Sequence, residues 1–311
     1  MLIATSGQFA EGLRERLARY AETAALDEIV DAGRGDAVTV LVTRGKLRVD
    51  RQLVESLPGL RKIIKAGSGL DTVDVAAAGE RGVAVVATGG SAGSVADLAM
   101  ALSFACLRHV GIFDRAVRAG AWHEKDRFVG STFASRRVGI VGFGRIGQAF
   151  AAMARALGAE VRAWDRSIAA GAKAGICRDA GVTACASLDR LLGDSDLVSL
   201  HLPHVPDTRG LIGRSEFGAM RPGTILVNTA RAAVVDHDAL VRALTDGPLA
   251  AAGLDVHYAE GKADADPLFA LPNVVLTPHV GAQSAQAHEA IADRIVEEVA
   301  SFAASIEEVS G

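Results

Sequence analysis

The chain has 311 residues, of which 50% are hydrophobic and 23% are charged, and its formal net charge is −4. This composition is typical of a globular protein that is long enough for two domains, and the mildly acidic charge without a long basic run predicts no nucleic-acid partner. The three cysteines form no C-x-x-C pair and no signal peptide is recognisable, so we expect reduced thiols, no metal site and a cytoplasmic location. The most apolar stretch, 95–107, contains Asp97 and is too short to cross a bilayer, so no membrane contact is expected.

Residues 1–93 alternate between short apolar runs and helical patterns. The runs are rich in β-branched residues and predict strands, and the segments between them carry helical periodicity. The predicted strands are 2–5, 38–43, 60–65 and 83–87, and the predicted helices are 9–24, 49–57 and 73–81. This βα alternation is typical of a parallel sheet that helices cover on both faces.

Residues 87–94, ATGGSAGS, are small and predict a hinge. A long apolar helix is expected from 94 to about 119, and the segment 120–135, which carries Trp122, is expected to be irregular. A second βα series follows, with predicted strands 138–141, 160–164, 197–200, 224–228, 250–255 and 274–276 and a closing helix over 284–304. The sequence therefore predicts an α/β protein with two domains.

The stretch 137–165 carries the most specific pattern in the chain. Gly142, Gly144 and Gly147 follow a buried strand in G-x-G-x-x-G spacing, and a helical pattern begins at once. The first glycine permits a tight turn, the second lets a pyrophosphate approach the backbone, and the third lets the helix pack close to the strand. Asp165 closes the next strand 18 residues after Gly147, near the spacing of a carboxylate that binds an adenosine ribose. The pattern predicts dinucleotide binding, the alternative being a tight turn without a ligand.

Asp165 also bears on which dinucleotide binds. A carboxylate at this position repels the 2′-phosphate of NADP, so Asp165 favours NAD. Arg166 follows it directly, and this cation keeps NADP open as a second cofactor.

Two predicted strand ends carry groups that suit an anionic substrate. The loop Gly67-Ser68-Gly69 follows strand 60–65, and its consecutive N–H groups can hold a carboxylate, the alternative being an ordinary β–α turn. Arg231 follows strand 224–228, at the sheet edge where ligands bind in open α/β folds. Its planar fork suits a carboxylate and a neighbouring keto oxygen, the alternative being a surface ion pair with Asp236 or Asp238.

Two further strand ends carry groups that can transfer or position a proton. Glu260 lies just past strand 250–255, where the alternative is a solvated loop carboxylate. His279 follows Pro278 at the end of strand 274–276, where the alternative is a packed or capping histidine. His201 has the same placement after strand 197–200 and competes with His279 for the role of general acid.

Taken together, these motifs resemble the D-isomer-specific 2-hydroxyacid dehydrogenases. The resemblance covers nearly the whole chain and rests on motifs that occur in the family's order and spacing: GSGLDTVD, SVAD, VGIVGFGRIG, DLVSLHLPHVPDTRGLI, MRPGTILVNTARAAVVD, AAGLDV and LPNVVLTPHVGAQS. It implies two Rossmann-like domains with parallel sheets and an active-site cleft between them. A discontinuous, flavodoxin-like substrate-binding domain would comprise 1–93 and 285–311, and an NAD-binding Rossmann domain would comprise 94–284.

The resemblance implies a catalytic trio of Arg231, Glu260 and His279. His279 would protonate the keto oxygen as hydride reaches C2 of a 2-oxo acid, and would take the proton back in the reverse reaction. Glu260 would hydrogen-bond the other ring nitrogen and favour the imidazolium. Arg231 would bind the substrate carboxylate and keto oxygen, and the N–H groups of Ser68 and Gly69 would hold the carboxylate from the other domain.

NAD is the predicted cofactor, with contacts from the glycine-rich loop, the following strand and the ends of later strands. The predicted cofactor-binding residues are Gly142, Gly144, Arg145, Ile146, Gly147, Asp165, His201, Pro203, Thr208, Thr229 and Asp255. The family also implies a homodimer packed through the cofactor domain, with the 95–107 helix and the 120–135 segment as its contact surface, the alternative being a monomer that buries the same helix internally.

The predicted substrate is a small 2-hydroxy or 2-oxo acid. Arg44 and Lys65 lie on the expected substrate side of the first domain, and phosphoglycerate dehydrogenases have basic residues at matching places that help to hold the phosphate. The alternative is that both are solvated cations, so 3-phosphoglycerate, glycerate with hydroxypyruvate, and glyoxylate all stay open. A different class of function also stays open, that of an NAD(H)-sensing binding protein like the corepressors that resemble this family.

Overall fold

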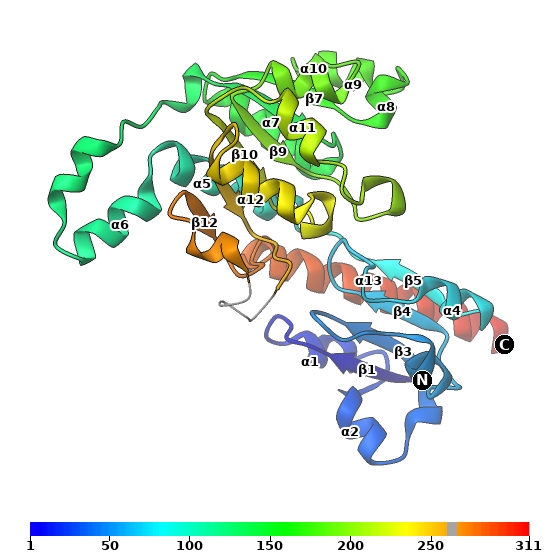
Figure 1. Ribbon diagram of the computed structural model, residues 1–311. Helices are drawn as coiled ribbons and strands as arrows, with labels where there is room; N and C mark the ends of the chain where they lie inside the picture. The colour runs from blue at the N-terminus through cyan, green and yellow to red at the C-terminus, as the bar shows by residue number, and fades with distance from the viewer. Residues whose placement is uncertain (260–265, 311) are drawn as a thin grey trace. The chain divides into compact units, whose positions relative to one another are not determined.

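Two parallel β-sheets organise the chain (Figure 1). The computed structural model describes residues 1–259 and 266–310. Unit 1 comprises Met1–Ser91 and Ala282–Gly311, and unit 2 comprises Ala92–Gly281. The predicted α/β class with two parallel sheets is confirmed. The predicted domain boundaries lie within three residues of these unit boundaries, and the active site predicted between the domains stays a prediction.

Unit 1 contains a five-stranded sheet with the order β2-β1-β3-β4-β5, in which all neighbouring strands are parallel. This is the strand order of flavodoxin-like folds. Side chains alternate between the two faces of the sheet, so Ile3 packs into one core cluster and Leu2 and Ala4 pack into the other. The strands are β1 (Leu2–Ser6), β2 (Glu22–Ala25), β3 (Val38–Thr43), β4 (Lys62–Lys65) and β5 (Ala84–Ala87).

Helices contribute to both core clusters of unit 1. Ile29, Val54 and Ala78 join the cluster that contains Leu2, whereas Leu17 and Ile295 join the cluster that contains Ile3. The helices are α1 (Leu13–Leu17), α2 (Leu26–Asp31), α3 (Arg51–Glu55), α4 (Val75–Glu80) and α13 (Ala285–Ser310). The last helix of the chain therefore completes the core around the first strand, which explains why unit 1 is discontinuous in sequence.

The helix predicted over 9–24 is wrong for most of its length. Only Leu13–Leu17 is helical, and Glu22–Ala25 forms β2, which pairs with β1 in parallel. The alanines of this segment favour a helix, but the open edge of β1 offers a complete set of backbone hydrogen bonds, and that tertiary pairing overrides the local propensity. Thr5 reinforces the pairing by donating from its hydroxyl to the carbonyl of Ala24 at 3.2 Å.

Unit 2 contains a seven-stranded parallel sheet with the order β12-β11-β10-β9-β6-β7-β8. Strand order reverses between β6 and β9, and ligands of doubly wound folds bind outside the carboxyl ends of the strands at such a switch point. The strands are β6 (Arg137–Val141), β7 (Glu160–Trp164), β8 (Thr183–Ala184), β9 (Leu197–Leu200), β10 (Thr224–Asn228), β11 (Leu249–Leu254) and β12 (Val274–Leu276).

All but one of the α-helices of unit 2 fall into two groups with separate cores. Phe150 of α7 packs with Leu102 of α5, and Leu191 of α10 packs in a second cluster with Phe217 of α11 and Leu240 of α12. The helices are α5 (Ala92–Leu107), α6 (Val110–Arg118), α7 (Arg145–Ala156), α8 (Arg166–Ala169), α9 (Ala174–Asp179), α10 (Leu188–Gly193), α11 (Arg214–Ala219) and α12 (His237–Thr245). Short 3-10 turns occupy Trp122–Arg127, Phe133–Ser135, Pro206–Thr208, Ala232–Val234 and Pro267–Ala270.

The single helix predicted from 94 to about 119 is interrupted. It divides into α5 and α6 at His109, whose φ of 53° is left-handed and therefore ends the α-helical path. In Figure 1, α6 extends away from the helices that cover the sheet of unit 2, and none of its residues is buried. Val117 and Trp122 are exposed there, and the predicted homodimer contact through this segment stays a prediction.

Of the described residues, no single helix is long and apolar enough to cross a membrane. The pair α5 and α6, bent by 64°, reaches that length and composition only when the two helices are taken together.

Candidate active site

The glycine-rich loop joins β6 to α7, and its three glycines meet different surroundings. Gly142 has a φ of +95°, and a Cβ there would lie 2.4 Å from the carbonyl oxygen of His201. A Cβ on Gly147 would lie 2.2 Å from the carbonyl oxygen of Gly142. A Cβ on Gly144 would meet no atom of the described residues within 4 Å. The fold thus requires the first and third glycines, whereas the second borders open space at the N-terminus of α7, where a phosphate is attracted. Arg145 and Ile146, two further predicted contacts, form the first turn of that helix.

Asp165 follows β7 at the carboxyl edge of the same sheet. Its Oδ2 accepts from the backbone N–H of Phe143 at 3.1 Å and from Lys173 Nζ at 2.6 Å, and its Oδ1 accepts from Ile168 N–H at 2.8 Å. Burial raises the pKa of Asp165, but the hydrogen bonds from Lys173 and the two N–H groups outweigh burial and lower the pKa below its ordinary value. The carboxylate is therefore charged and fixed beside the glycine-rich loop.

His201 follows β9, and its surroundings argue against the role of general acid. Its Nε2 lies 2.9 Å from Ser199 Oγ, and its ring packs on Phe150 with centroids 5.3 Å apart. Burial lowers the pKa of His201 to about 3. The ring is therefore neutral near pH 7, and no imidazolium is present to act as the general acid. His279, by contrast, is exposed.

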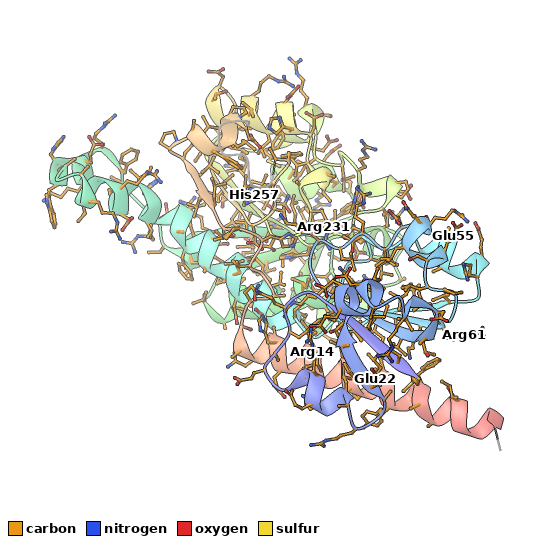
Figure 2. The ribbon with its side chains drawn as sticks, turned by 90° about the horizontal axis from the view of Figure 1, so that it is seen from below. Arg14, Glu22, Glu55, Arg61, Arg231 and His257 are labelled. Atoms are coloured by element: carbon orange, nitrogen blue, oxygen red, sulfur yellow. The ribbon has the colours of Figure 1, made fainter. Side chains whose placement is uncertain are left out.

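Arg231 follows β10 (Figure 2). Asn228, the last residue of that strand, accepts from the N–H of Ala230 at 3.0 Å and donates from its amide to the carbonyl of Arg231 at 3.0 Å. These two bonds fix the backbone turn that presents the guanidinium. The two carboxylates considered as alternative partners have other contacts: Asp236 accepts from Ala239 N–H at the start of α12, and Asp238 lies 3.2 Å from His237 Nδ1.

His279 lies in a tight turn after β12 that the carboxylate of Asp255 holds. Asp255 is 1% exposed, and it accepts from Thr277 Oγ1 at 2.6 Å, Val280 N–H at 2.8 Å and Gly281 N–H at 2.9 Å. His279 itself has a φ of 59°, and its N–H donates to the carbonyl of Thr277 at 3.0 Å. A left-handed backbone is costly for a residue with a side chain and persists only where its surroundings enforce it. Asp255 and its three donors supply that enforcement.

His257 supports the same turn from the end of β11. Its Nε2 lies 2.7 Å from the carbonyl oxygen of Thr277, and its ring meets Phe269 edge to face. Glu260, the third member of the predicted trio, lies outside the described residues.

The remaining predicted cofactor contacts lie after β9 and β10. Thr208 donates from its hydroxyl to the carbonyl of Pro203 at 2.6 Å, which closes the turn 203–208. Thr229 follows β10 and is buried. Its hydroxyl oxygen and the Nδ1 of His201 are buried polar atoms that have no hydrogen-bond partner among the described residues. Because buried polar atoms are normally paired, both atoms fit a site that a polar ligand completes.

In unit 1, the predicted substrate-binding residues follow β3 and β4. Lys65 is buried and donates from Nζ to the carbonyl of Gly45 at 3.0 Å, and Arg44 Nη2 lies 2.9 Å from His288 Nε2. The Gly67 N–H donates to Thr88 Oγ1 at 3.0 Å, which anchors the loop whose next residues are Ser68 and Gly69. Burial lowers the pKa of Arg44, and burial with the nearby Arg44 charge lowers the pKa of His288.

Two neighbours of these sites, Lys173 and His288, were missed by sequence reasoning. Neither lies at a strand end or in a recognisable motif, so no local signal marks them. Among the described residues, no group of three His, Cys, Asp or Glu side chains is arranged to hold a metal ion.

The residues at the carboxyl edge of the unit 2 sheet fit a dinucleotide. Gly144 leaves open space beside the start of α7, and Asp165 supplies a carboxylate at the end of β7. After β9 and β10 lie buried polar atoms of His201 and Thr229 that have no partner in the part of the chain that the structure describes. Because all seven strands are parallel, Arg231 and His279 follow strands that end at this same edge. The edge thus brings residues that suit a nucleotide, the guanidinium of Arg231 and the imidazole of His279 onto one sheet.

Comparisons with known proteins identify the family that this chain resembles. A family model described as D-isomer specific 2-hydroxyacid dehydrogenase, NAD binding domain, matches residues 100–281. The chain is 38% identical over 265 residues to a hydroxypyruvate reductase of Thermotoga maritima, covering 84% of each protein. It is 40% identical over 262 residues to a D-3-phosphoglycerate dehydrogenase of Mycobacterium tuberculosis, covering 83% of this chain and 48% of that protein, so it spans about half the length of that relative.

A solved structure extends the likeness to the fold. The crystal structure of a glyoxylate reductase from Paecilomyes thermophila is similar with a TM-score of 0.85 at 29% identity, covering 97% of this chain and 95% of that chain. The resemblance inferred from the motifs is confirmed by these matches, and the prediction of NAD as cofactor is confirmed by the NAD-binding domain that the family model describes.

The open space at Gly144 predicts that binding and folding respond differently to substitutions in the glycine-rich loop. We expect Gly144→Val to lower the melting temperature less than Gly142→Ala, because a Cβ there meets no described protein atom within 4 Å, and to weaken NADH binding by at least about tenfold, because the side chain fills the phosphate site. Gly142→Ala is the matched variant: its clash with the carbonyl of His201 and its positive φ lower the melting temperature itself. Thermal melts and NADH fluorescence titrations measure the two effects. Unchanged NADH affinity in a folded Gly144→Val protein would place the phosphates elsewhere.

Proposed function

This chain belongs to the D-isomer-specific 2-hydroxyacid dehydrogenase family and is an NAD-dependent oxidoreductase of that class. We propose that it interconverts hydroxypyruvate, or its 3-phosphate, with the corresponding D-2-hydroxy acid. The single observation that carries the reaction is the shared carboxyl edge of the unit 2 sheet, where the glycine-rich loop, Arg231 and His279 follow β6, β10 and β12. The substrate class rests on Arg44 and Lys65, two cations at the ends of β3 and β4. Glyoxylate is the smaller acid that the same catalytic residues accept.

The bound dinucleotide supplies a hydride to C2 of the 2-oxo acid. His279 gives a proton to the keto oxygen as negative charge develops there, and takes it back in the oxidative direction. Asp255 keeps the His279 turn in its left-handed conformation, so the imidazole is positioned before the substrate arrives. The family's third catalytic position falls on Glu260, which we propose to hydrogen-bond the imidazole and favour its protonated form.

Arg231 binds the carboxylate of the substrate through its planar fork and stabilises the charge that develops on the keto oxygen. Its backbone is fixed by Asn228 and its Nη1 donates to the carbonyl of Ala230 at 2.7 Å, so main chain and side chain are both held before the substrate arrives. The N–H groups of Ser68 and Gly69 offer a second contact to the same carboxylate.

Arg44 and Lys65 bind the substituent on C3 of the substrate. Arg44 keeps a positive charge near pH 7 although burial lowers its pKa, because an arginine pKa starts above about 12. Its neighbour His288 is neutral near pH 7 and does not cancel the charge of the guanidinium, so Arg44 can still bind an anion. These two cations favour a hydroxyl or phosphate on C3 over the methyl group of pyruvate.

A panel of 2-oxo acids tests the substrate class. With NADH as reductant, we expect the highest kcat/KM with hydroxypyruvate or phosphohydroxypyruvate, a lower value with glyoxylate, and the lowest with pyruvate. Arg44→Gln is expected to lower kcat/KM for the C3-substituted acids by at least about tenfold, because it removes a charge-assisted hydrogen bond. Glyoxylate is the internal control, since it has no C3 and its kcat/KM stays nearly constant.

Two outcomes of this panel would contradict the proposal. Pyruvate turning over as fast as hydroxypyruvate would remove the role of Arg44 and Lys65. Turnover of none of the four acids, despite measurable NADH binding, would favour an NAD(H)-sensing protein over an enzyme.

His279→Ala tests the general acid. We expect kcat to fall at least about a hundredfold, because a positioned acid contributes about that much or more, while the Kd for NADH stays nearly constant. His123→Ala, which removes a histidine that is 78% exposed on a 3-10 turn, is the matched control and keeps full activity. A loss of kcat below about tenfold would show that His279 is not the acid.

A further inference from the structure

Lys173 contacts the carboxylate that is expected to bind the adenosine ribose. Its Nζ lies 2.6 Å from Asp165 Oδ2 and 3.3 Å from the carbonyl oxygen of Phe143, in the glycine-rich loop. The side chains are only 28% and 11% exposed, so the pair is screened less than a surface ion pair. The ammonium therefore lies between the end of β7 and the loop that follows β6.

This ion pair changes what Asp165 offers to a nucleotide. Oδ2 already accepts from Phe143 N–H and Lys173, and Oδ1 accepts from Ile168 N–H, which leaves Oδ1 as the oxygen with capacity for a ribose hydroxyl. Selection against a 2′-phosphate by a carboxylate works through the repulsion of two negative charges. Paired with Lys173, Asp165 presents a nearly neutral group, and that repulsion is largely removed.

A second cation adjoins the pair. Arg166, the residue after Asp165, contacts the carboxylate of Asp207, and both side chains are exposed. Exposed ion pairs of this kind contribute little free energy and exchange partners readily. A phosphate monoester carries more charge than the Asp207 carboxylate, so it competes well for the guanidinium.

We propose that Lys173 determines the cofactor specificity of this chain by neutralising Asp165, so that the chain binds NADPH with an affinity close to its affinity for NADH. The proposal rests on the dinucleotide site of the proposed function and extends it to the phosphorylated cofactor. When NADH binds, Lys173 stays on Asp165 and Oδ1 accepts from the ribose. When NADPH binds, Lys173 and Arg166 face the 2′-phosphate and offset its charge.

The ratio of two dissociation constants tests this proposal without any turnover. Fluorescence titrations give the Kd values of NADH and NADPH for the whole chain and for three variants: Lys173→Met, Lys173→Arg and Arg178→Met. We expect the two Kd values of the unsubstituted chain to agree within about tenfold, and Lys173→Met to raise the NADPH/NADH ratio by at least about tenfold, because it exposes a bare carboxylate to the phosphate. Lys173→Arg keeps the charge and is expected to keep the ratio.

Arg178→Met is the matched control. It removes one exposed cation from α9, the helix that follows Lys173, and leaves the ratio unchanged. Two results would overturn the proposal: an NADPH/NADH ratio of Kd values above about ten in the unsubstituted chain, or a rise of that ratio in Lys173→Met of less than about tenfold. Equal weakening of both cofactors in Lys173→Met would also overturn it and would leave Lys173 only a structural tie to the glycine-rich loop. Failure of the unsubstituted chain to bind either cofactor would be a different result, which contradicts the dinucleotide site itself.

Discussion

The hydrogen bonds accepted by Asp255 are the interaction on which the position of His279 depends. The carboxylate lies at the end of β11, and its three donors, Thr277, Val280 and Gly281, surround His279 after β12. A buried carboxylate is stable only when it is well paired, and a left-handed histidine persists only when it is held. Both requirements are met by the same three hydrogen bonds: the turn supplies the donors that pair Asp255, and Asp255 fixes the turn that holds His279.

The parallel sheet of unit 2 turns this local arrangement into a site. Parallel strands all end at one edge, so the glycine-rich loop after β6, Arg231 after β10 and the His279 turn after β12 share that edge. The chemistry then divides by strand. The loops after β6 and β7 suit a dinucleotide, and the loops after β10 and β12 suit an acid with a keto oxygen. His201, which lies after β9, is half-buried and neutral near pH 7, whereas His279 is exposed.

Sequence reasoning succeeded where the signal was local and failed where a distant contact decided the outcome. The glycine-rich loop and the placement of Asp165, Arg231 and His279 after strands could be predicted, because each follows an apolar run in a recognisable spacing. Residues 22–25 could not, since their strand conformation depends on pairing with β1. The break at His109 is a single left-handed residue within an otherwise apolar helical pattern, which leaves no trace in periodicity.

The same limit applies to the partners of charged residues. Asp165 was identified from its spacing, but its pairing with Lys173 depends on how the chain folds back before α9. Asp255 was predicted to bind the cofactor. The structure adds three hydrogen bonds to the His279 turn that use much of its accepting capacity, and its contact with the cofactor stays a prediction.

Kinetics of Asp255→Asn test the central claim most directly. The amide keeps the size of the carboxylate, but in either orientation its NH₂ group faces a backbone N–H, of Val280 or of Gly281, and leaves that donor unpaired at a cost of about 1–3 kcal/mol. If Asp255 positions His279, kcat falls by at least about tenfold, and the fall in kcat exceeds any rise in the Kd for NADH. Full kcat in a folded Asp255→Asn protein, or a loss confined to NADH affinity, would contradict the account.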